Sequence, residues 1–535
     1  MHVPAALPDL RGDFRTDDVA RALYSEGAGV FRIVPQAVAV PQDAEDLARL
    51  VRWAAAEGVA LVPRGAGSGM QGGNVGSGVA LDLTRACRDA PLVDPDAKTA
   101  RCGASVTYRA LNDAAQPYGL YLPPDPSSGA FCTLGGMTAT NAAGAHSVKY
   151  GTMRRWVRAL EFMTAEAETG STRTRGASGT AAEERFLRDV APDLSAHAVE
   201  LAAATPRTPK NSSGYALDVF ARSGRTADLL VGSEGTLAIV TGVEVALAPL
   251  PATRTTLLVT LGSLEQVGPA VLALRPLGPS TLELLDRTYL DFVRGAAQRH
   301  LPAGTEAVLL VEFEDGADEA AAAVRDIATS VELADDPTTV GKLWELRHLA
   351  SPLLASLPDN LRSLQVVEDG CVPPEQLARY IAGLRAAAAA GDFGIVIFGH
   401  AGDGHLHANL LADVTVADFP QRLAACLERV TAEQIALGGT PSGEHGDGRL
   451  RAPFVERTFG TTYIDLCRRT RSAWDPAGIL NPGVKILRNG DAAGLRPELL
   501  KVGAHAPALP AGIASRLREI ERTAAWGTFR LDFAR

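Results

Sequence analysis

The chain has 535 residues, of which 46% are hydrophobic and 21% charged, and its formal net charge is -10 at pH 7. This length exceeds what one compact core usually holds, so at least two domains are expected, and the acidic balance without a long basic run argues against a nucleic-acid partner. No apolar run approaches the roughly 20 residues of a membrane-spanning helix, and the N-terminus does not resemble a secretory signal, so we expect a cytoplasmic protein without a membrane span.

Residues 37–83 predict a strand–helix–strand–loop–strand unit. An apolar run over 37–40 precedes Asp43, which can cap a helix that ends at Gly58, and strands are expected over 59–62 and 79–83. The loop between those two strands holds seven glycines from Gly65 to Gly78. Glycine lets backbone N–H groups approach a pyrophosphate closely, although the glycine count alone does not distinguish a phosphate cradle from a series of tight turns. A strand follows the loop and no GK[ST] triplet is present, so neither a Rossmann nor a Walker motif fits.

More glycine-rich stretches follow this loop in a fixed order. After PRGAGSG come PPDPSS, TLGG, NAAG, KYG and GSEGTL. Over roughly residues 25–250 this order resembles the FAD-binding domain of the vanillyl-alcohol oxidase and p-cresol methylhydroxylase (PCMH) superfamily. The resemblance implies non-covalent FAD, because the first loop has no histidine and only His146 and Cys132 lie near the other motifs. The cofactor-binding residues that it implies are Arg64, Gly65, Gly67, Ser68, Gly69, Pro124, Ser127, Gly135, Gly136, Asn141, Gly144, Glu234, Gly235, Ile239 and Asn481.

The rest of the chain has a different character. From about 251 to 470, strands alternate with alanine-rich helices, which predicts a second α+β domain. We therefore expect an α+β, two-domain flavoprotein. It would have a PCMH-type FAD-binding domain over 1–250 and a substrate- and metal-binding cap domain, built on an antiparallel sheet, over 251–470. Residues 471–535 would form a C-terminal segment that returns to the FAD domain.

Histidines gather in two short motifs of the second domain. A buried strand is expected to end at His400, and after a tight turn His405, His407 and Asn409 share one face of the next strand. A lone histidine on a strand is more often a hydrogen-bonded core residue, but two histidines on a hairpin can converge on one ion. Glu444, in a second glycine-rich turn, offers a carboxylate as a third ligand. Such a set leaves positions open for a substrate.

The motifs GHAGDGHLH, SGEHGDGRL and AWDPAGILNPGVKI resemble the C-terminal domain of FAD-linked 2-hydroxy-acid dehydrogenases, which include D-lactate, glycolate and D-2-hydroxyglutarate dehydrogenases. The resemblance implies one divalent metal (Zn, Mn or Fe) held by His400, His407 and Glu444, with His445 as the catalytic base. It also implies that Arg347 binds the substrate carboxylate, although an exposed helix charge is an equal alternative.

Two positions depart from the pattern of that family. His405 stands where asparagine is usual, and we expect it to support the metal ligands from behind. The stretch 366–370 lacks the lysine that D-2-hydroxyglutarate dehydrogenases use.

The predicted reaction is oxidation of a small D-2-hydroxy acid, D-lactate or D-2-hydroxyglutarate, to the 2-oxo acid. FAD would take the hydride and pass electrons to a protein or quinone acceptor. The six scattered cysteines cannot hold an iron–sulfur cluster, so a separate iron–sulfur or other electron-acceptor protein is a possible partner. Four alternatives remain open: an oxygen-using oxidase, a flavin-binding subunit of a larger dehydrogenase complex, an ether-lipid synthase and a flavin-free metallohydrolase.

Overall fold

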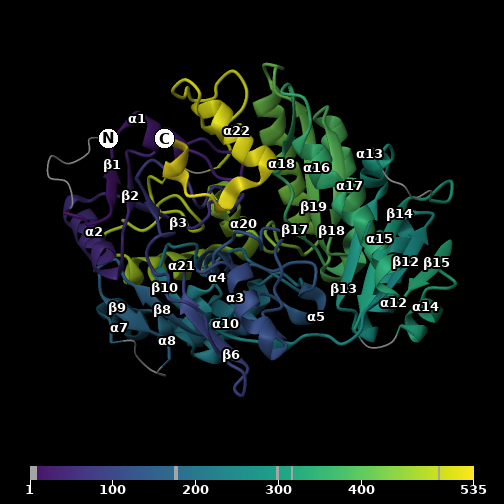
Figure 1. Ribbon diagram of the computed structural model, residues 1–535, viewed down its shortest axis with the longest axis horizontal. Helices are drawn as coiled ribbons and strands as arrows, with labels where there is room; N and C mark the ends of the chain where they lie inside the picture. Colours follow the sequence, from purple (N-terminus) through teal and green to yellow (C-terminus); the bar gives the residue numbers. More distant parts are fainter. Residues whose placement is uncertain (1–8, 174–178, 297–300, 315–316, 492–493, 535) are drawn as a thin grey trace.

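A computed structural model describes residues 9–173, 179–296, 301–314, 317–491 and 494–534 of the chain. Residues 1–8, which entered the interpretation of the N-terminus, lie outside this part. Figure 1 shows the N-terminal half on the left, a large sheet on the right, and the end of the chain back beside its beginning. The predicted α+β class with two flavoprotein-type domains is confirmed.

The first sheet contains the predicted strand–helix–strand–loop–strand unit. Strands β2, β4 and β3 are parallel, and β1 pairs with β2 in the antiparallel direction. The four strands are β1 Asp13–Arg15, β2 Ala37–Val40, β3 Leu61–Arg64 and β4 Val79–Asp82.

Helix α2 (Ala44–Glu57) connects β2 to β3 and is capped as predicted. The Asp43 carboxylate accepts hydrogen bonds from two backbone N–H groups of the first turn, each at 3.1 Å. The third strand begins at Leu61, later than expected, because the Val59 N–H still bonds the Ala54 carbonyl at 2.8 Å and so belongs to the helix end.

The second sheet is antiparallel, in the order β5–β6–β10–β8–β9. Its strands are β5 Leu92–Asp94, β6 Thr99–Gly103, β8 Val157–Met163, β9 Thr169–Ser171 and β10 Ile239–Ala246. Helices α7 (Ala181–Asp189), α10 (Leu217–Ser223) and α21 (Thr461–Trp474) share its hydrophobic cluster.

Helix α21 reaches this cluster from the far end of the chain. The rings of Phe162 and Trp474 meet edge to face with centroids 5.6 Å apart, and Val455 and Phe459 belong to the same cluster. The domain limits at 250 and 470 stay a prediction, and this packing favours a return to the flavin side before residue 470.

The third sheet has eight antiparallel strands in the order β15–β12–β14–β13–β18–β19–β16, with β17 beside β19. It confirms the antiparallel sheet expected for the second domain. The strands are β12 Thr255–Leu261, β13 Thr281–Asp286, β14 Ala307–Phe313, β15 Ser330–Ala334, β16 Leu361–Leu364, β17 Gly370–Cys371, β18 Gly394–Gly399 and β19 His405–Asp413.

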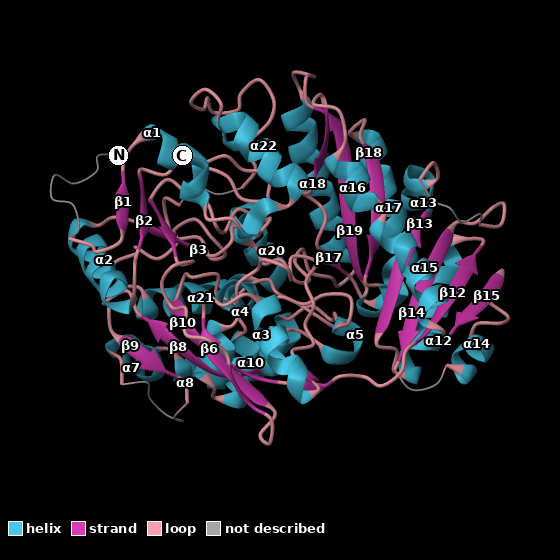
Figure 2. Cartoon of the chain, viewed as in Figure 1, coloured by secondary structure: helices cyan, strands magenta, loops and turns pink. Residues whose placement is uncertain are grey.

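Helices cover both faces of this sheet (Figure 2). Along β12, Leu257 and Val259 pack on one side and Leu258 on the other, as the two-residue period of a strand requires. The first side carries α12 (Val267–Leu274), α17 (Leu377–Ala390) and α18 (Phe419–Ala436), and the second carries α13 (Arg287–Val293) and α15 (Pro337–His348). With both faces covered, the polar groups of the site gather where strands end.

The end of the chain packs against its beginning. Leu517 and Ile520 of α22 (Ile513–Thr523) share a hydrophobic cluster with Ala20 and Leu23 of α1 (Asp18–Leu23). In Figure 1 this places yellow α22 near purple α1. Among the described residues, none of the helices has the length and apolar content that crossing a bilayer requires.

Candidate active site

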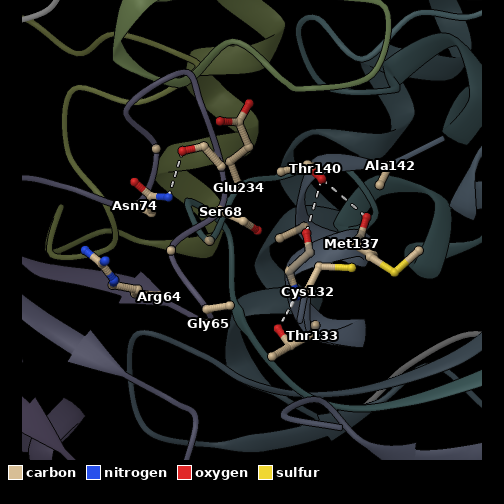
Figure 3. A pocket seen from close by; sticks show the side chains of 18 of the residues that line it. Arg64, Gly65, Ser68, Asn74, Cys132, Thr133, Met137, Thr140, Ala142 and Glu234 are labelled. Carbon is tan, nitrogen blue, oxygen red and sulfur yellow. Dashed lines mark hydrogen bonds between the residues drawn. The ribbon is translucent and has the colours of Figure 1, made fainter. Parts of the chain in front are cut away.

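A deep cleft lies between the first glycine-rich loop, helix α4 (Leu134–Thr140) and the start of β10 (Figure 3). Its volume is about 1440 Å³ when the space at its open mouth is counted. Small residues bring backbone to its wall: a Cβ at Gly135 would lie 2.8 Å from that of Ala104. The predicted cofactor-binding residues that line the cleft are Arg64, Gly65, Gly67, Ser68, Gly69, Ser127, Gly135, Gly136, Glu234, Gly235 and Ile239.

Four predicted cofactor-binding residues, Pro124, Asn141, Gly144 and Asn481, are not on the cleft wall. Asn481 Nδ2 donates to the carbonyls of Gly73 at 2.8 Å and Glu234 at 2.9 Å, and so joins the glycine loop to the later flavin motif. Asn141 Oδ1 accepts from the Arg154 N–H at 3.0 Å. These two brace the cleft, and direct flavin contact by any of the four stays a prediction.

Glu234 links the cleft to the turn that carries Glu444 and His445. Its two carboxylate oxygens accept hydrogen bonds from the backbone N–H groups of Asp447 and Gly448 at 2.8 and 2.9 Å. The buried Lys485 ammonium lies 3.2 Å from Glu234 and 3.1 Å from the Asp447 carboxylate. Glu234 therefore holds this turn against the flavin side.

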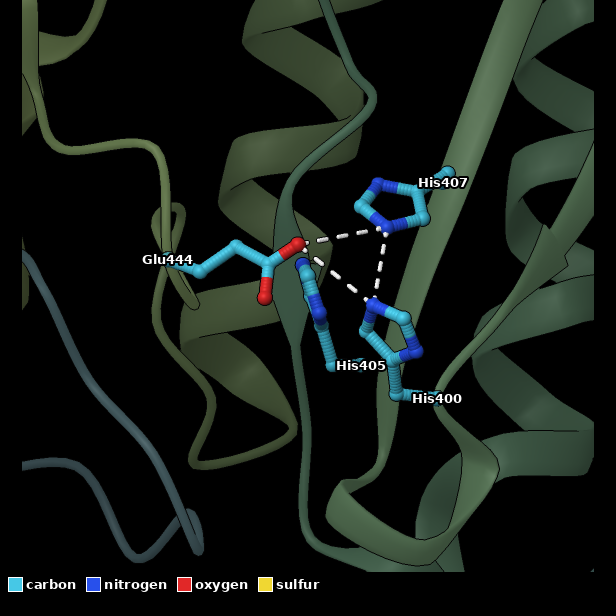
Figure 4. Close-up of side chains that lie close together, drawn as sticks. All are labelled: His400, His405, His407 and Glu444. Carbon is cyan, nitrogen blue, oxygen red and sulfur yellow. Dashed lines mark hydrogen bonds and ion pairs between the residues drawn. The ribbon is translucent and has the colours of Figure 1, made fainter. Parts of the chain in front are cut away.

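The predicted metal ligands do converge (Figure 4). Nε2 of His400 lies 3.3 Å from Nε2 of His407, and each of these atoms lies 3.4 Å from Oε1 of Glu444. In a tetrahedral site with metal–ligand distances of about 2.0–2.1 Å, two ligand atoms stand about 3.3–3.4 Å apart. The three atoms thus match one face of a tetrahedron, and the donor set fits a zinc or iron ion.

The hairpin of β18 and β19 positions the two histidines as predicted. His400 directly follows β18, and Phe398 pairs with His407 across the hairpin. Leu406 and Ala408 alternate with the histidines and point into the hydrophobic core. This packing fixes the register, because a slip by one residue would turn the histidines into the core.

Carboxylate and carbonyl oxygens hold the far sides of both rings. His400 Nδ1 bonds Oε1 of Glu283, which is fully buried on β13, and His407 Nδ1 lies 3.1 Å from the Glu368 carbonyl. When Nδ1 carries the proton, the Nε2 lone pairs face Glu444, as metal binding requires. Burial alone would lower the pKa of His400, but the Glu283 carboxylate raises it to about 9 in the metal-free protein.

His445 lies beside this triangle. Its Nε2 is 3.6 Å from Oε1 of Glu444, and its Nδ1 is 2.9 Å from Oε2 of Glu368. Burial alone would lower the pKa of His445, but the carboxylates of Glu368 and Asp369 raise it to about 10. Both Glu444 and His445 also line the flavin cleft.

His405 is fully buried and belongs to the same group of possible metal ligands as the triangle, whose ligand atoms all lie within 4.8 Å of one another. Its Nε2 lies 2.9 Å from Oδ1 of Asp369, and within the described part of the chain its Nδ1 has no hydrogen-bond partner. Burial lowers its pKa well below the ordinary value, which keeps the ring neutral. The supporting role expected for His405 stays a prediction.

Arg347 is not among the residues that line the flavin cleft. Its Nε bonds Oε2 of Glu283 at 2.7 Å, and its guanidinium lies 4.5 Å from the Phe398 ring centroid. Arg347 is therefore connected, through Glu283, to His400, a predicted metal ligand. Binding of a substrate carboxylate by its terminal nitrogens stays a prediction.

Sequence reasoning did not identify several groups of this site. Lys210, with 2% of its side chain exposed, donates to Oε2 of Glu444 at 3.0 Å and leaves Oε1 for the histidines. Arg451 lies 3.2 Å from Glu368 and 3.3 Å from Asp369. Burial alone would raise the pKa of Glu444, but Lys210 and His400 together with the other neighbouring groups hold it well below its usual range. No spacing rule points to Lys210, because 234 residues separate it from Glu444.

The glycine-walled cleft and the adjoining His–His–carboxylate triangle define a two-domain flavoprotein oxidoreductase. Residues 35–172 match the model of an FAD binding domain, and residues 250–484 match that of the FAD linked oxidases, C-terminal domain. The chain belongs to this family of FAD-linked oxidoreductases, which confirms the resemblance found in its motifs.

Two relatives and one solved structure show the extent of the likeness. The chain is 31% identical to the glycolate oxidase subunit GlcD of Bacillus subtilis (strain 168), over 88% of this chain and 93% of that protein. It is also 31% identical to a D-lactate dehydrogenase of Archaeoglobus fulgidus, over 89% and 95%. An alkyldihydroxyacetonephosphate synthase structure matches with a TM-score of 0.57 and 17% identity, over 88% and 82%, which shows a shared fold alone.

Proposed function

We propose that the chain oxidises a small D-2-hydroxy acid, D-lactate or D-2-hydroxyglutarate, to the 2-oxo acid. One observation carries the proposal: Glu444 is a corner of the metal triangle and, with His445, also lines the flavin cleft. A substrate held at the triangle would therefore lie beside the flavin. The names of the relatives, a glycolate oxidase subunit and a D-lactate dehydrogenase, support the substrate class.

His400, His407 and Glu444 would hold the divalent ion. When bound, FAD supplies the hydride acceptor, and the ion lowers the pKa of the substrate hydroxyl. His445 is positioned to accept the hydroxyl proton on Nε2, because Glu368 holds its Nδ1 side. A base must be neutral, so the raised pKa of metal-free His445 has to fall; a cation bound next to it has this effect through repulsion.

Arg347 would orient the substrate carboxylate. Within the part of the chain that the structure describes, its side-chain ion pair uses Nε alone. A guanidinium anchored through Nε can present its terminal nitrogens as a fork that matches two carboxylate oxygens.

Non-covalent FAD, a protein or quinone electron acceptor and a cytoplasmic location complete the proposal. Cys132 lines the cleft, and burial raises the pKa of its thiol to about 11, so it remains a weak nucleophile for flavin attachment. His146 Nδ1 is bound to the Asp125 carboxylate at 2.6 Å. Both observations support the proposal that FAD is held without a covalent bond.

Dye reduction by the purified protein tests the proposal. D- and L-2-hydroxy acids are offered before and after treatment with a chelator. We expect one D-acid to bleach the flavin, and chelation followed by addition of Zn²⁺ to abolish and restore this reaction. Bound flavin that no acid reduces would overturn the proposal, peroxide release would identify an oxidase, and colourless protein would favour a metallohydrolase.

A further inference from the structure

A second cavity adjoins the flavin cleft. Its wall shares Gly65, Ala66, Ser105 and Thr133 with the wall of that cleft. The C-terminal segment from Trp526 to Arg530 forms another part of the wall, and the volume is about 860 Å³ when its opening is counted. This segment lies beyond residue 484, where the match to the family's C-terminal domain ends. The cavity is thus partly built by chain outside the matched domains.

Arg530 is the unusual member of this wall. Only 4% of the residue is exposed, yet none of its three guanidinium nitrogens has a hydrogen-bond partner among the described residues. The Arg530 guanidinium lies 4.9 Å from the Trp526 ring centroid, which positions it without satisfying its donors. A buried guanidinium without partners is strongly unfavourable unless an anion or a polar ligand accepts its hydrogen bonds.

The surrounding charges also favour an anion. The charged residues on the wall are Asp82, Arg85, Arg88 and Arg530. Arg85 lies 3.6 Å from the Asp13 carboxylate, so Arg88 and Arg530 are the cations that face the cavity against Asp82. The Asp82 carboxylate is already engaged by the Tyr24 hydroxyl and by the N–H of Thr84 at 2.8 Å. Burial and the neighbouring Arg64 lower the pKa of Arg530 to about 9, so the side chain remains a cation at neutral pH.

We propose that this cavity binds a phosphoryl group, with Arg530 donating hydrogen bonds to its oxygens. The planar guanidinium of arginine presents paired N–H groups that match phosphate oxygens. The arginines around this cavity supply more positive charge and more hydrogen-bond donors than a single carboxylate needs. Two sources share this chemistry: the diphosphate of FAD, reached beside Gly65 and Ala66, or a separate phosphate ester. The inference goes beyond the proposed oxidation and does not depend on it.

Binding measurements on the full-length protein test the inference. Inorganic phosphate and ADP are titrated into flavin-loaded protein by calorimetry, and the FAD dissociation constant is measured on deflavinated protein. The variants are Arg530→Gln and Arg530→Leu, and the matched control is Arg522→Gln on the exposed face of α22. We expect both Arg530 variants to weaken one of these interactions at least about tenfold, while the control changes neither.

The phosphate and ADP titrations and the FAD titration together distinguish the two possible sources of the phosphoryl group. Weaker phosphate and ADP binding with unchanged FAD affinity identifies a separate phosphate ester, and weaker FAD binding alone identifies the cofactor's diphosphate. If both Arg530 variants bind phosphate, ADP and FAD like the unmodified protein, the inference is overturned. Folding is checked by the melting temperature of ligand-free Arg530→Leu, which should not fall, because the substitution removes a buried charge without partners. A marked fall would assign Arg530 a structural role instead.

Discussion

The flavin cleft and the proposed metal triangle are built from different parts of the chain. The cleft wall includes glycine-rich loops such as Gly65–Gly69 and Gly135–Gly136, where the backbone itself can face the cofactor. The triangle is made of side chains, and each ligand is held by a second side chain or carbonyl from a distant element, such as Glu283 on β13 or Lys210 before α10. A site walled by backbone tolerates the loss of a side chain but not the addition of one. A network of side chains tolerates an addition but not a loss.

Loss of a metal ligand should have the largest effect. In Glu444→Gln the triangle loses its charged corner, so we expect loss of the metal and a fall in dye reduction of more than about a hundredfold, since a bound ion contributes several kcal/mol to such reactions. Metal analysis and single-turnover flavin reduction measure this. Flavin absorbance should stay unchanged, and a variant that retains full metal content and full activity would refute the assignment.

Removing the support behind a ligand should have a smaller effect. Glu283→Gln weakens the hold on His400 Nδ1, and metal affinity should fall about 10–100-fold, as is usual for such supporting groups. Chelator competition provides the measurement. Glu312→Gln is a matched control, because Glu312 is a buried glutamate on the neighbouring strand that binds His146 instead. Equal losses in both variants would show a general effect of buried charge.

Flavin binding in the cleft should be impaired by adding a methyl group, whereas the metal triangle is impaired by removing a charged group. Gly67 has φ of 79°, and a Cβ there would lie 2.3 Å from Nη2 of Arg64, which is buried and bonded to the Glu26 carbonyl. Gly67→Ala should weaken FAD binding at least about tenfold, or about 1.4 kcal/mol, and leave metal affinity unchanged.

Gly119→Ala provides the control for Gly67→Ala. Gly119 has a similar φ of 68°, but a Cβ at this position would meet no atom within 4 Å. Backbone strain is therefore matched while the clash is absent. Normal FAD binding by Gly67→Ala, measured by fluorescence titration, would contradict the backbone-built cleft.

The smallest effect concerns the contact between the two halves of the chain. His146 bonds Asp125 on the flavin side and lies 3.3 Å from Glu312 of the large sheet. Burial alone would lower the pKa of His146, but these carboxylates raise it to about 10. A raised pKa stabilises the fold most below the unfolded value of about 6.5, and this stabilisation disappears as the pH rises to about 10.

The difference in melting temperature between the unmodified protein and His146→Gln should therefore shrink from pH 6 to pH 10. Thermal unfolding at several pH values tests this. A difference that grows with pH would exclude a protonated His146 at the contact.

Sequence reasoning reached the features that are local or periodic. The turn after His400 predicted the hairpin, the alternation of Leu406 and Ala408 with His405 and His407 predicted the shared face of the histidines, and the order of glycine motifs predicted the cleft. Lys210, Glu283 and Arg451 escaped notice because each is an ordinary charged residue whose partner lies far along the chain. Only tertiary packing, which composition and spacing do not encode, brings such pairs together. The start of β3 was misplaced for a smaller reason, since the end of α2 retains Val59.

Glu234 contacts both the flavin cleft and the turn next to the proposed metal site. It lines the flavin cleft, and its carboxylate also holds the turn that carries Glu444 and His445 through the N–H groups of Asp447 and Gly448. If an ion at the triangle shifted this turn, the shift would reach the cleft wall and create a coupling free energy between flavin and metal. Such coupling is reciprocal, so the factor by which metal changed FAD affinity would equal the factor by which FAD changed metal affinity. A coupling that tightened both would favour the fully loaded protein over either half-loaded form.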